Sequence, residues 1–201
     1  MINIEKSKQV FTDIVIHNSD VRRQEGISKF LDWLKNTDFF YAPASTKYHG
    51  AYPGGLCEHS LDVWRWANRL SIPLCIDTSP ENLMIPALFH DICKANFYTV
   101  DYRNKKNSAG VWEKVPYYTI DDSMPLGHGE KSVMLIQRFV PLYDDEIAAI
   151  NWHMGFSDMR CASFAGQNAL SAAFEKYPLA FLIHSADMAA SYRENRRGDE
   201  K

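Results

Sequence analysis

The chain has 201 residues, of which 46% are hydrophobic and 13% aromatic, and its formal net charge is −3. This apolar content is enough to build a core, which excludes a disordered or fibrous protein. The mildly acidic charge argues against a protein that grips nucleic acid through bulk positive charge. No apolar run approaches the length of a membrane span, and the charged N-terminus lacks the apolar stretch of a signal peptide. We therefore expect one domain, located in the cytoplasm.

Hydrophobic periodicity predicts helices along most of the chain. The first forty residues read as helical, with a break near His17–Asp20, and they are followed by a loop rich in Pro, Gly and Ser, YAPASTKYHGAYPGG. Further helices are predicted at 56–70, 80–93, 128–140, 144–153, 167–176 and 178–194. Residues 195–201 read as a frayed tail. The four cysteines form no CxxC pair, so we expect free thiols or small core residues rather than a zinc site.

The segment 96–120 differs from its surroundings. FYTVDY and VPYYTI are β-prone and aromatic, and NKKNSAG between them is a turn signal. The sequence thus predicts a mainly α protein with one inserted β-hairpin at about 96–120. Its aromatic side chains either pack on the helical body or on a second subunit, or stack on the bases of a nucleotide or single strand with help from nearby basic residues.

Histidines and aspartates recur at the predicted helix ends. They are His59 in GGLCEHS, the adjacent pair His90 and Asp91 in HDICK, His128 in LGHGEKS, His153 in INWHMG, and Asp187 within an apolar helix. A single histidine at a helix end is commonly a cap, but a carboxylate on an apolar face needs a cation, a metal or several donors. As a group, these side chains are the ligands that borderline divalent metals prefer.

This ordered set resembles the HD superfamily of metal-dependent phosphohydrolases. HDICK resembles the HDIGK motif of that family, with Cys93 where glycine is common, and PASTKYHGAYPGGLCEHSLDV is similar to the start of the HD domain in bacterial 3′–5′ exoribonucleases of the YhaM type. It is also similar to the HD domain of some conjugative relaxases. The resemblance covers about Tyr41 to Ser191. It implies an HD-domain helical bundle over 41–194, on which residues 1–40 pack as a helical segment.

The resemblance also implies a site with two metals. His59, His90, Asp91 and Asp187 would hold one ion, His128 and His153 would hold the second, and Asp91 would bridge them. A hydroxide shared by the two metals would attack the phosphorus atom. These ligands suit Mn or Fe better than Ca, while Co, Ni and Mg stay open.

Four further residues are candidates for contact with the substrate. Lys94 follows His90 by one turn and would bind a phosphate or stabilise developing charge in catalysis, although a lysine at a helix end also extends to solvent for ordinary reasons. Lys131, His49 and Arg160 are weaker candidates for substrate binding. For His184 two interpretations are equally consistent with the sequence: it supports the metal site, or it is a histidine packed in the core.

The expected activity is metal-dependent hydrolysis of a phosphoester in a nucleotide or short oligonucleotide. The 201 residues leave no room for the N-terminal OB-fold of the exoribonucleases, which favours a small substrate. Two alternatives stay open: a di-iron oxygenase, because some HD-type oxygenases use the same ligand order, and a non-catalytic module that senses a nucleotide. A homo-oligomeric state is also left open.

Overall fold

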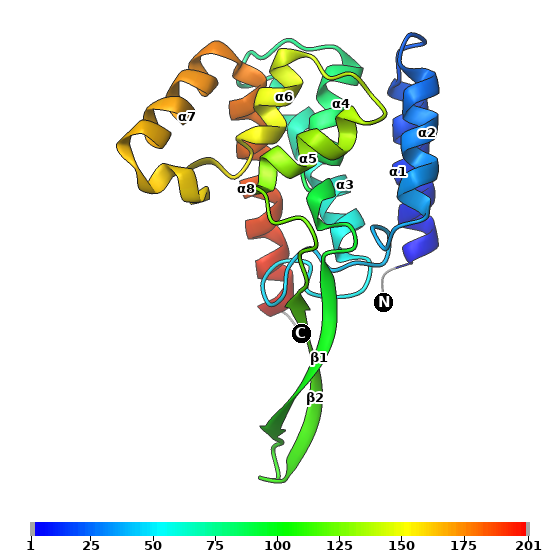
Figure 1. Ribbon diagram of the computed structural model, residues 1–201, viewed down its shortest axis with the longest axis vertical. Coiled ribbons are helices and arrows are strands. Elements are labelled where there is room, and N and C mark those ends of the chain that lie inside the picture. The colour runs from blue at the N-terminus through cyan, green and yellow to red at the C-terminus, as the bar shows by residue number, and fades with distance from the viewer. Residues whose placement is uncertain (1–2, 200–201) are drawn as a thin grey trace.

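The computed structural model describes residues 3–199, with side chains for residues 3–192. This part of the chain forms eight α-helices and one two-stranded antiparallel hairpin, which confirms the prediction of a mainly helical protein with a hairpin insertion (Figure 1). The helices are α1 (Ile4–Asn18), α2 (Gln24–Lys35), α3 (Gly55–Ser71), α4 (Pro80–Phe89), α5 (His128–Gln137), α6 (Asp144–Asn151), α7 (Phe164–Lys176) and α8 (Pro178–Asp199). Short 3₁₀ helices lie at Ile92–Lys94, Gly155–Ser157 and Met159–Ala162.

Several helix ends differ from the predicted boundaries: α5 ends at Gln137 rather than 140, α6 ends at Asn151 rather than 153, and α7 begins at Phe164 rather than 167. The helix predicted over 80–93 ends at Phe89, and a 3₁₀ turn follows at Ile92–Lys94. In a 3₁₀ turn residues three apart lie above one another, which brings the ammonium of Lys94 to 2.7 Å from the carboxylate of Asp91. At the other end of the chain, the backbone of α8 includes residues 195–199 of the predicted tail, and residues 200–201 lie outside the described part.

The core contains an aromatic cluster that joins the N-terminal helices to α4. Phe11 of α1 lies 5.2 Å from Phe39 between ring centroids, and Phe30 of α2 lies 4.8 Å from Phe89 at the end of α4. All four rings are fully buried. Packing of these rings fixes the end of α4, and therefore the backbone of the adjacent His90.

A second cluster lies where α3, α4, α6 and α8 pack together. It is rich in alanine, and Ala67, Ala87, Ala149 and Ala186 are all fully buried. Small side chains allow helices to approach closely, so residues at the ends of these four helices come near one another. Among the described residues, no helix combines the length and apolar character that crossing a membrane requires.

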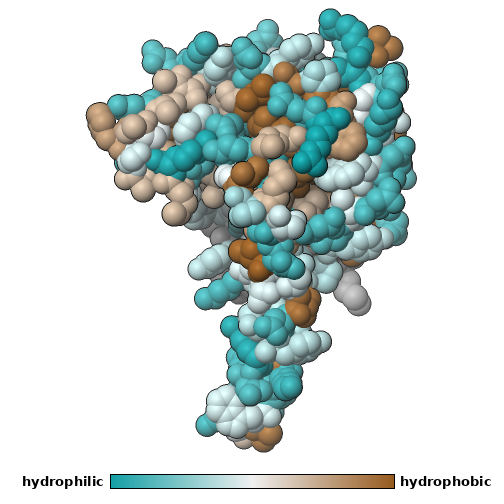
Figure 2. All heavy atoms as spheres, in the orientation of Figure 1, coloured by the Kyte–Doolittle hydropathy of each residue, from teal (hydrophilic) through white to brown (hydrophobic). Residues whose placement is uncertain are grey.

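The hairpin consists of β1 (Tyr98–Lys106) and β2 (Trp112–Ile120) and projects from the helical body (Figures 1 and 2). Tyr102 and Trp112 are 61% and 64% exposed, so these rings do not pack on the body of the same chain. Packing on the body of the same chain is thus excluded for these two rings, and a second subunit and the bases of a nucleic acid stay as the alternatives.

Candidate metal centre

Six side chains from five helices or helix ends meet inside the body. They are His59 in the first turns of α3, His90 and Asp91 just past the end of α4, His128 at the start of α5, His153 just past the end of α6, and Asp187 in the middle of α8. They are the six residues that the sequence analysis assigns to the metals. The structure therefore brings together histidine and aspartate groups that could hold metal ions.

Two glycines allow the backbone to place these helix ends. Gly54, which precedes α3, has a φ of 84°, a backbone conformation that residues other than glycine rarely adopt. At Gly129 of α5 an added Cβ would lie 2.4 Å from the carbonyl oxygen of Asn151, at the end of α6. This close approach sets His128 beside His153, with ring centroids 5.7 Å apart.

The carboxylate of Asp91 lies between two pairs of histidines. Its Oδ1 is 2.9 Å from Nε2 of His128 and 3.5 Å from Nε2 of His153. Its Oδ2 is 3.4 Å from Nε2 of His90 and 3.8 Å from Nε2 of His59. Each oxygen thus faces its own pair of imidazoles, which is the arrangement that a carboxylate shared by two cations requires.

Backbone carbonyls determine which ring nitrogen of two histidines carries the proton. Nδ1 of His90 lies 3.1 Å from the carbonyl oxygen of Ala87, and Nδ1 of His153 lies 2.7 Å from that of Ile150. A carbonyl only accepts, so both Nδ1 atoms donate, and in the neutral rings the lone pairs are on Nε2. Burial lowers the pKa of His90, which favours its neutral form. The buried Nε2 of His153 has no hydrogen-bond partner among the described residues, as expected of a ligand atom.

The two carboxylates of the cluster are ionised despite their burial. Burial alone would raise the pKa of Asp91, but Lys94 and the surrounding histidines hold it well below its usual range. Asp187 behaves in the same way, because the ring of His59, with its Nε2 3.0 Å from Oδ1, outweighs the effect of burial and lowers the pKa of the carboxyl. Anionic oxygens and imidazole nitrogens therefore converge in a buried volume, and this donor set could hold metal ions.

The thiol of Cys93 also lies close to Asp91 and His128, with the potential ligand atoms of the three residues within 4.8 Å of one another. The sequence predicts that this cysteine is a free thiol or a small core residue, and its side chain is 2% exposed. Burial raises the pKa of the thiol to about 12, so it is protonated near neutral pH, whereas the form that binds metals is the thiolate.

Of the four predicted substrate contacts, two border the cluster directly. Lys94 is buried and donates to Asp91, and burial alone would lower the pKa of its ammonium, but Asp91 raises it. The ring of His49, in the loop before α3, lies 4.9 Å from the ring of His59 between centroids.

The other two have partners outside the cluster. The ammonium of Lys131 donates to Asp122 and lies 5.1 Å from the ring centroid of Phe97. Arg160 donates to Asp158 and to the backbone of Asn151, and it stacks over Trp152 at 4.0 Å. Its guanidinium is thus occupied at the end of α6, and its phosphate contact is a prediction that the structure leaves open.

Two further residues border the cluster: Tyr98, for which the sequence predicts no role at the metal site, and His184, for which it leaves two roles open. Tyr98 lies beside Lys94 at the root of the hairpin, where its hydroxyl donates to the carbonyl of Ala44 at 3.2 Å. His184 of α8 donates its Nδ1–H to the carbonyl of His153 at 2.7 Å, so it supports the backbone of a predicted ligand. The sequence does offer a signal for His184, because this residue precedes Asp187 by three residues on the same helix. Only the fold distinguishes a histidine packed in the core from one that supports the metal site.

The side chains of the cluster differ in their exposure to solvent. The side chains of His59, His90 and His153 are at most 1% exposed, whereas that of His128 is 28% exposed. His128, at the start of α5, is therefore the most exposed of the six side chains.

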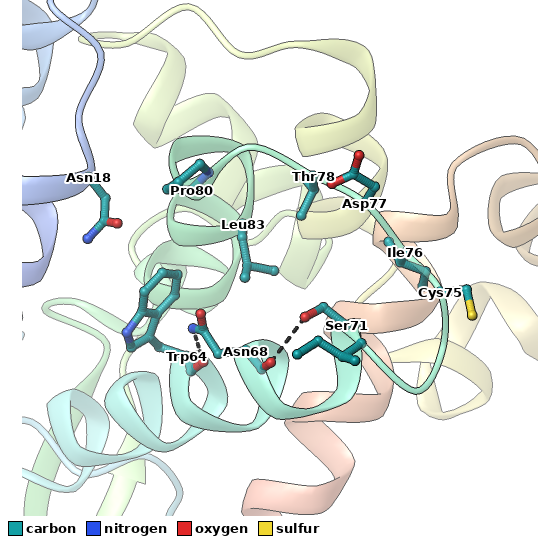
Figure 3. A pocket seen from close by; sticks show the side chains of 11 residues that line it. Asn18, Trp64, Asn68, Ser71, Cys75, Ile76, Asp77, Thr78, Pro80 and Leu83 are labelled. Carbon is teal, nitrogen blue, oxygen red and sulfur yellow. Dashed lines mark hydrogen bonds between the residues drawn. The ribbon is translucent and has the colours of Figure 1, made fainter.

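A surface pocket of about 560 Å³ lies at the opposite ends of α3 and α4, away from these residues (Figure 3). It is lined by Trp64, Asn68 and Leu83 among others, and it contains none of the clustered histidines. Asn68 donates to the carbonyl of Trp64, and Ser71 donates to that of Asn68, so both side chains serve the helix itself. This pocket offers no comparable set of chemical groups.

Comparison of the chain with protein-family profiles, with curated proteins and with solved structures finds no significant match.

Proposed function

We propose that the protein is a metal-dependent phosphohydrolase with an HD-type helical domain and two divalent ions, Mn or Fe, that cleaves a phosphoester of a nucleotide or short oligonucleotide. One observation carries the proposal: each oxygen of Asp91 faces a separate pair of imidazole Nε2 atoms in a buried site. A site that binds a single metal does not require a carboxylate between two pairs of ligands. The motif resemblance described above supports the same reaction class.

In this proposal His59, His90, Asp91 and Asp187 hold one ion, and His128 and His153 hold the second together with Asp91. When bound, the metals supply positive charge that stabilises phosphate oxygens and a water made acidic enough to act as a nucleophile near neutral pH. The carbonyls of Ala87 and Ile150 orient two of the rings before any metal arrives. Such second contacts fix the ring orientation and raise ligand basicity.

Lys94 contributes in two ways. Its contact with Asp91 keeps the carboxylate ionised and oriented, although both groups are buried. An ammonium has three N–H donors, so a phosphate oxygen can accept from the remaining ones. In this proposal His49, whose ring lies beside that of His59, and Lys131, three residues after His128 on α5, contact the rest of a substrate.

The test combines metal analysis with a generic phosphodiester substrate. Protein stripped with EDTA and reloaded with Mn²⁺ is expected to bind two metals per chain and to hydrolyse bis-p-nitrophenyl phosphate. Asp91→Ala removes the shared ligand, so metal affinity and turnover should fall by more than the roughly 10- to 100-fold effect of losing a supporting contact. Asp32→Ala, which removes an exposed aspartate on α2, serves as the control and should leave both unchanged.

Other outcomes would contradict the proposal. An active Asp91→Ala protein with a native circular dichroism spectrum would rule out the assigned centre. Two bound irons with oxygen uptake and no phosphoester turnover would favour the di-iron oxygenase. A single metal per chain would assign His128 and His153 to the substrate instead.

A further inference from the structure

The register of the hairpin sorts its side chains onto two faces. Residues that pair directly across an antiparallel ladder point to the same side, and successive residues alternate. The pairs Tyr102–Pro116 and Lys106–Trp112 therefore share one face with Tyr98, Lys114 and Tyr118, which we call the aromatic face. Asp101, Arg103, Lys105, Glu113 and Tyr117 lie on the opposite, polar face.

The aromatic face is open to solvent along most of its length. Val100 is 54% exposed, in addition to the exposed rings of Tyr102 and Trp112. A two-stranded hairpin that packs on nothing is marginally stable in water, and exposed apolar surface of this kind marks a site of interaction. The aromatic face therefore has the properties of a binding surface.

The distribution of charge identifies the kind of partner. Both acidic residues of the two strands, Asp101 and Glu113, lie on the polar face, so the charged residues of the aromatic face are the lysines Lys106 and Lys114. The ammonium of Lys106 lies 5.2 Å from the ring centroid of Trp112, which places a cation and a large ring side by side. Positive charge interleaved with aromatic rings, free of carboxylates, is typical of surfaces that bind single-stranded nucleic acid. A purely apolar partner would form no favourable electrostatic interaction with these lysines.

The root of the aromatic face lies beside the metal centre. At its root Tyr98 lies beside Lys94, and the chain that leaves the hairpin after Ile120 returns to the body at His128. A nucleic-acid strand lying along the aromatic face would thus end near Lys94, whose ammonium is 2.7 Å from Asp91.

We propose that the aromatic face binds single-stranded nucleic acid, with bases stacked on Tyr102 and Trp112 and phosphates paired with Lys106 and Lys114. This binding uses no residue of the metal centre and needs no metal. It therefore goes beyond the proposed reaction and can be tested separately from it.

The experiment measures fluorescence anisotropy of labelled oligo(dT) and oligo(U) of about 12 nucleotides, in EDTA and at low salt. Tyr102→Ala and Trp112→Ala should each weaken binding about tenfold, as loss of one stacked base does. Tyr117→Ala removes a ring from the polar face and should change the affinity less than twofold. In the same way Lys114→Gln should weaken binding and reduce its salt dependence, whereas Lys105→Gln on the polar face should do neither.

Circular dichroism of each variant controls for folding. Absence of binding by the wild-type chain at low salt, or equal losses on the two faces, would overturn the proposal. A concentration-dependent dimer that Tyr102→Ala dissociates, without any oligonucleotide binding, would also overturn it and would assign the face to a second copy of the chain. Tyr102→Ala and Trp112→Ala should keep the wild-type metal content and hydrolysis of bis-p-nitrophenyl phosphate, so that failure of the metal centre and failure of the hairpin are distinguished.

Discussion

At the ends of α4 and α6 the same local geometry occurs twice. His90 and His153 each follow a helix and donate Nδ1–H to the carbonyl three residues back, at 3.1 and 2.7 Å. A local hydrogen bond thus selects the ring tautomer and aims Nε2 inward, whatever else surrounds the ring. Sequence reasoning can find such histidines by their place at a helix end, but it cannot tell that both are aimed at one carboxylate.

Buried thiols provide a pH-dependent prediction at the scale of single residues. Burial raises the pKa of Cys57 and of Cys93 to about 12, while a thiol in the unfolded chain ionises near 8.5. A group whose pKa is higher in the folded state adds stability below the unfolded pKa, and this stability is lost as the pH rises toward the folded pKa. We expect the free energy of unfolding to fall between about pH 8.5 and 12, measured by urea denaturation in EDTA.

The exposed Cys75 is the matched control for this prediction. A thiol reagent at pH 8 should modify Cys75 rapidly in the native protein, and Cys75→Ser should abolish that fast reaction. Cys57 and Cys93 should react only as the chain unfolds. Rapid labelling of either buried thiol in the Cys75→Ser variant would show that the ends of α3 and α4 are less tightly packed than described.

At the scale of elements, the contact between the start of α5 and the end of α6 decides the second half of the metal centre. Gly129→Ala would place a methyl group 2.4 Å from the backbone oxygen of Asn151 and force the two helices apart. Overpacking of this kind costs about 1–3 kcal/mol of stability, and it should also lower metal content by separating His128 from His153. Urea denaturation in EDTA measures the first effect, and metal analysis measures the second.

Gly127→Ala is the control, because its added Cβ would meet the end of the flexible Glu130 side chain, which can move aside. We expect that variant to keep its metal content. If Gly129→Ala retains both wild-type stability and wild-type metal content, the close approach of α5 and α6 does not position these histidines.

At the scale of the whole molecule, a buried arginine connects the N-terminal helices to the body. Arg23, which precedes α2, lies 2.6 Å from Glu81 of α4 and 2.7 Å from Glu146 of α6, and its side chain is 4% exposed. Arg23→Ala would leave two carboxylates buried without their cation, which typically costs about 3–5 kcal/mol. Chemical denaturation should therefore show a large loss of stability.

The neighbouring Arg22 is the control for this prediction. Its pair with Asp20 is exposed to solvent, and exposed pairs contribute little, so Arg22→Ala should leave the denaturation curve nearly unchanged. Equal losses in the two variants would mean that the buried contacts of Arg23 do not hold the N-terminal helices on the body.

The sequence by itself determined the helical elements and the hairpin, because hydrophobic period and turn residues act over short distances along the chain. The helix after the double glycine was expected from residue 56 and begins at Gly55, and Ile27, Phe30, Leu31 and Leu34 form a buried face as their spacing indicates. Candidate metal ligands could also be identified from the sequence, because burying a histidine or aspartate on an apolar face costs free energy unless a partner binds it.

Only the tertiary structure decided how those side chains meet. That each oxygen of Asp91 faces a different pair of histidines, that Arg160 is held by Asp158 and Trp152, and that the rings of Tyr102 and Trp112 are exposed all depend on how distant segments pack. Local periodicity carries no information about such contacts, because packing between elements sets the distance and direction of every side chain within the cluster.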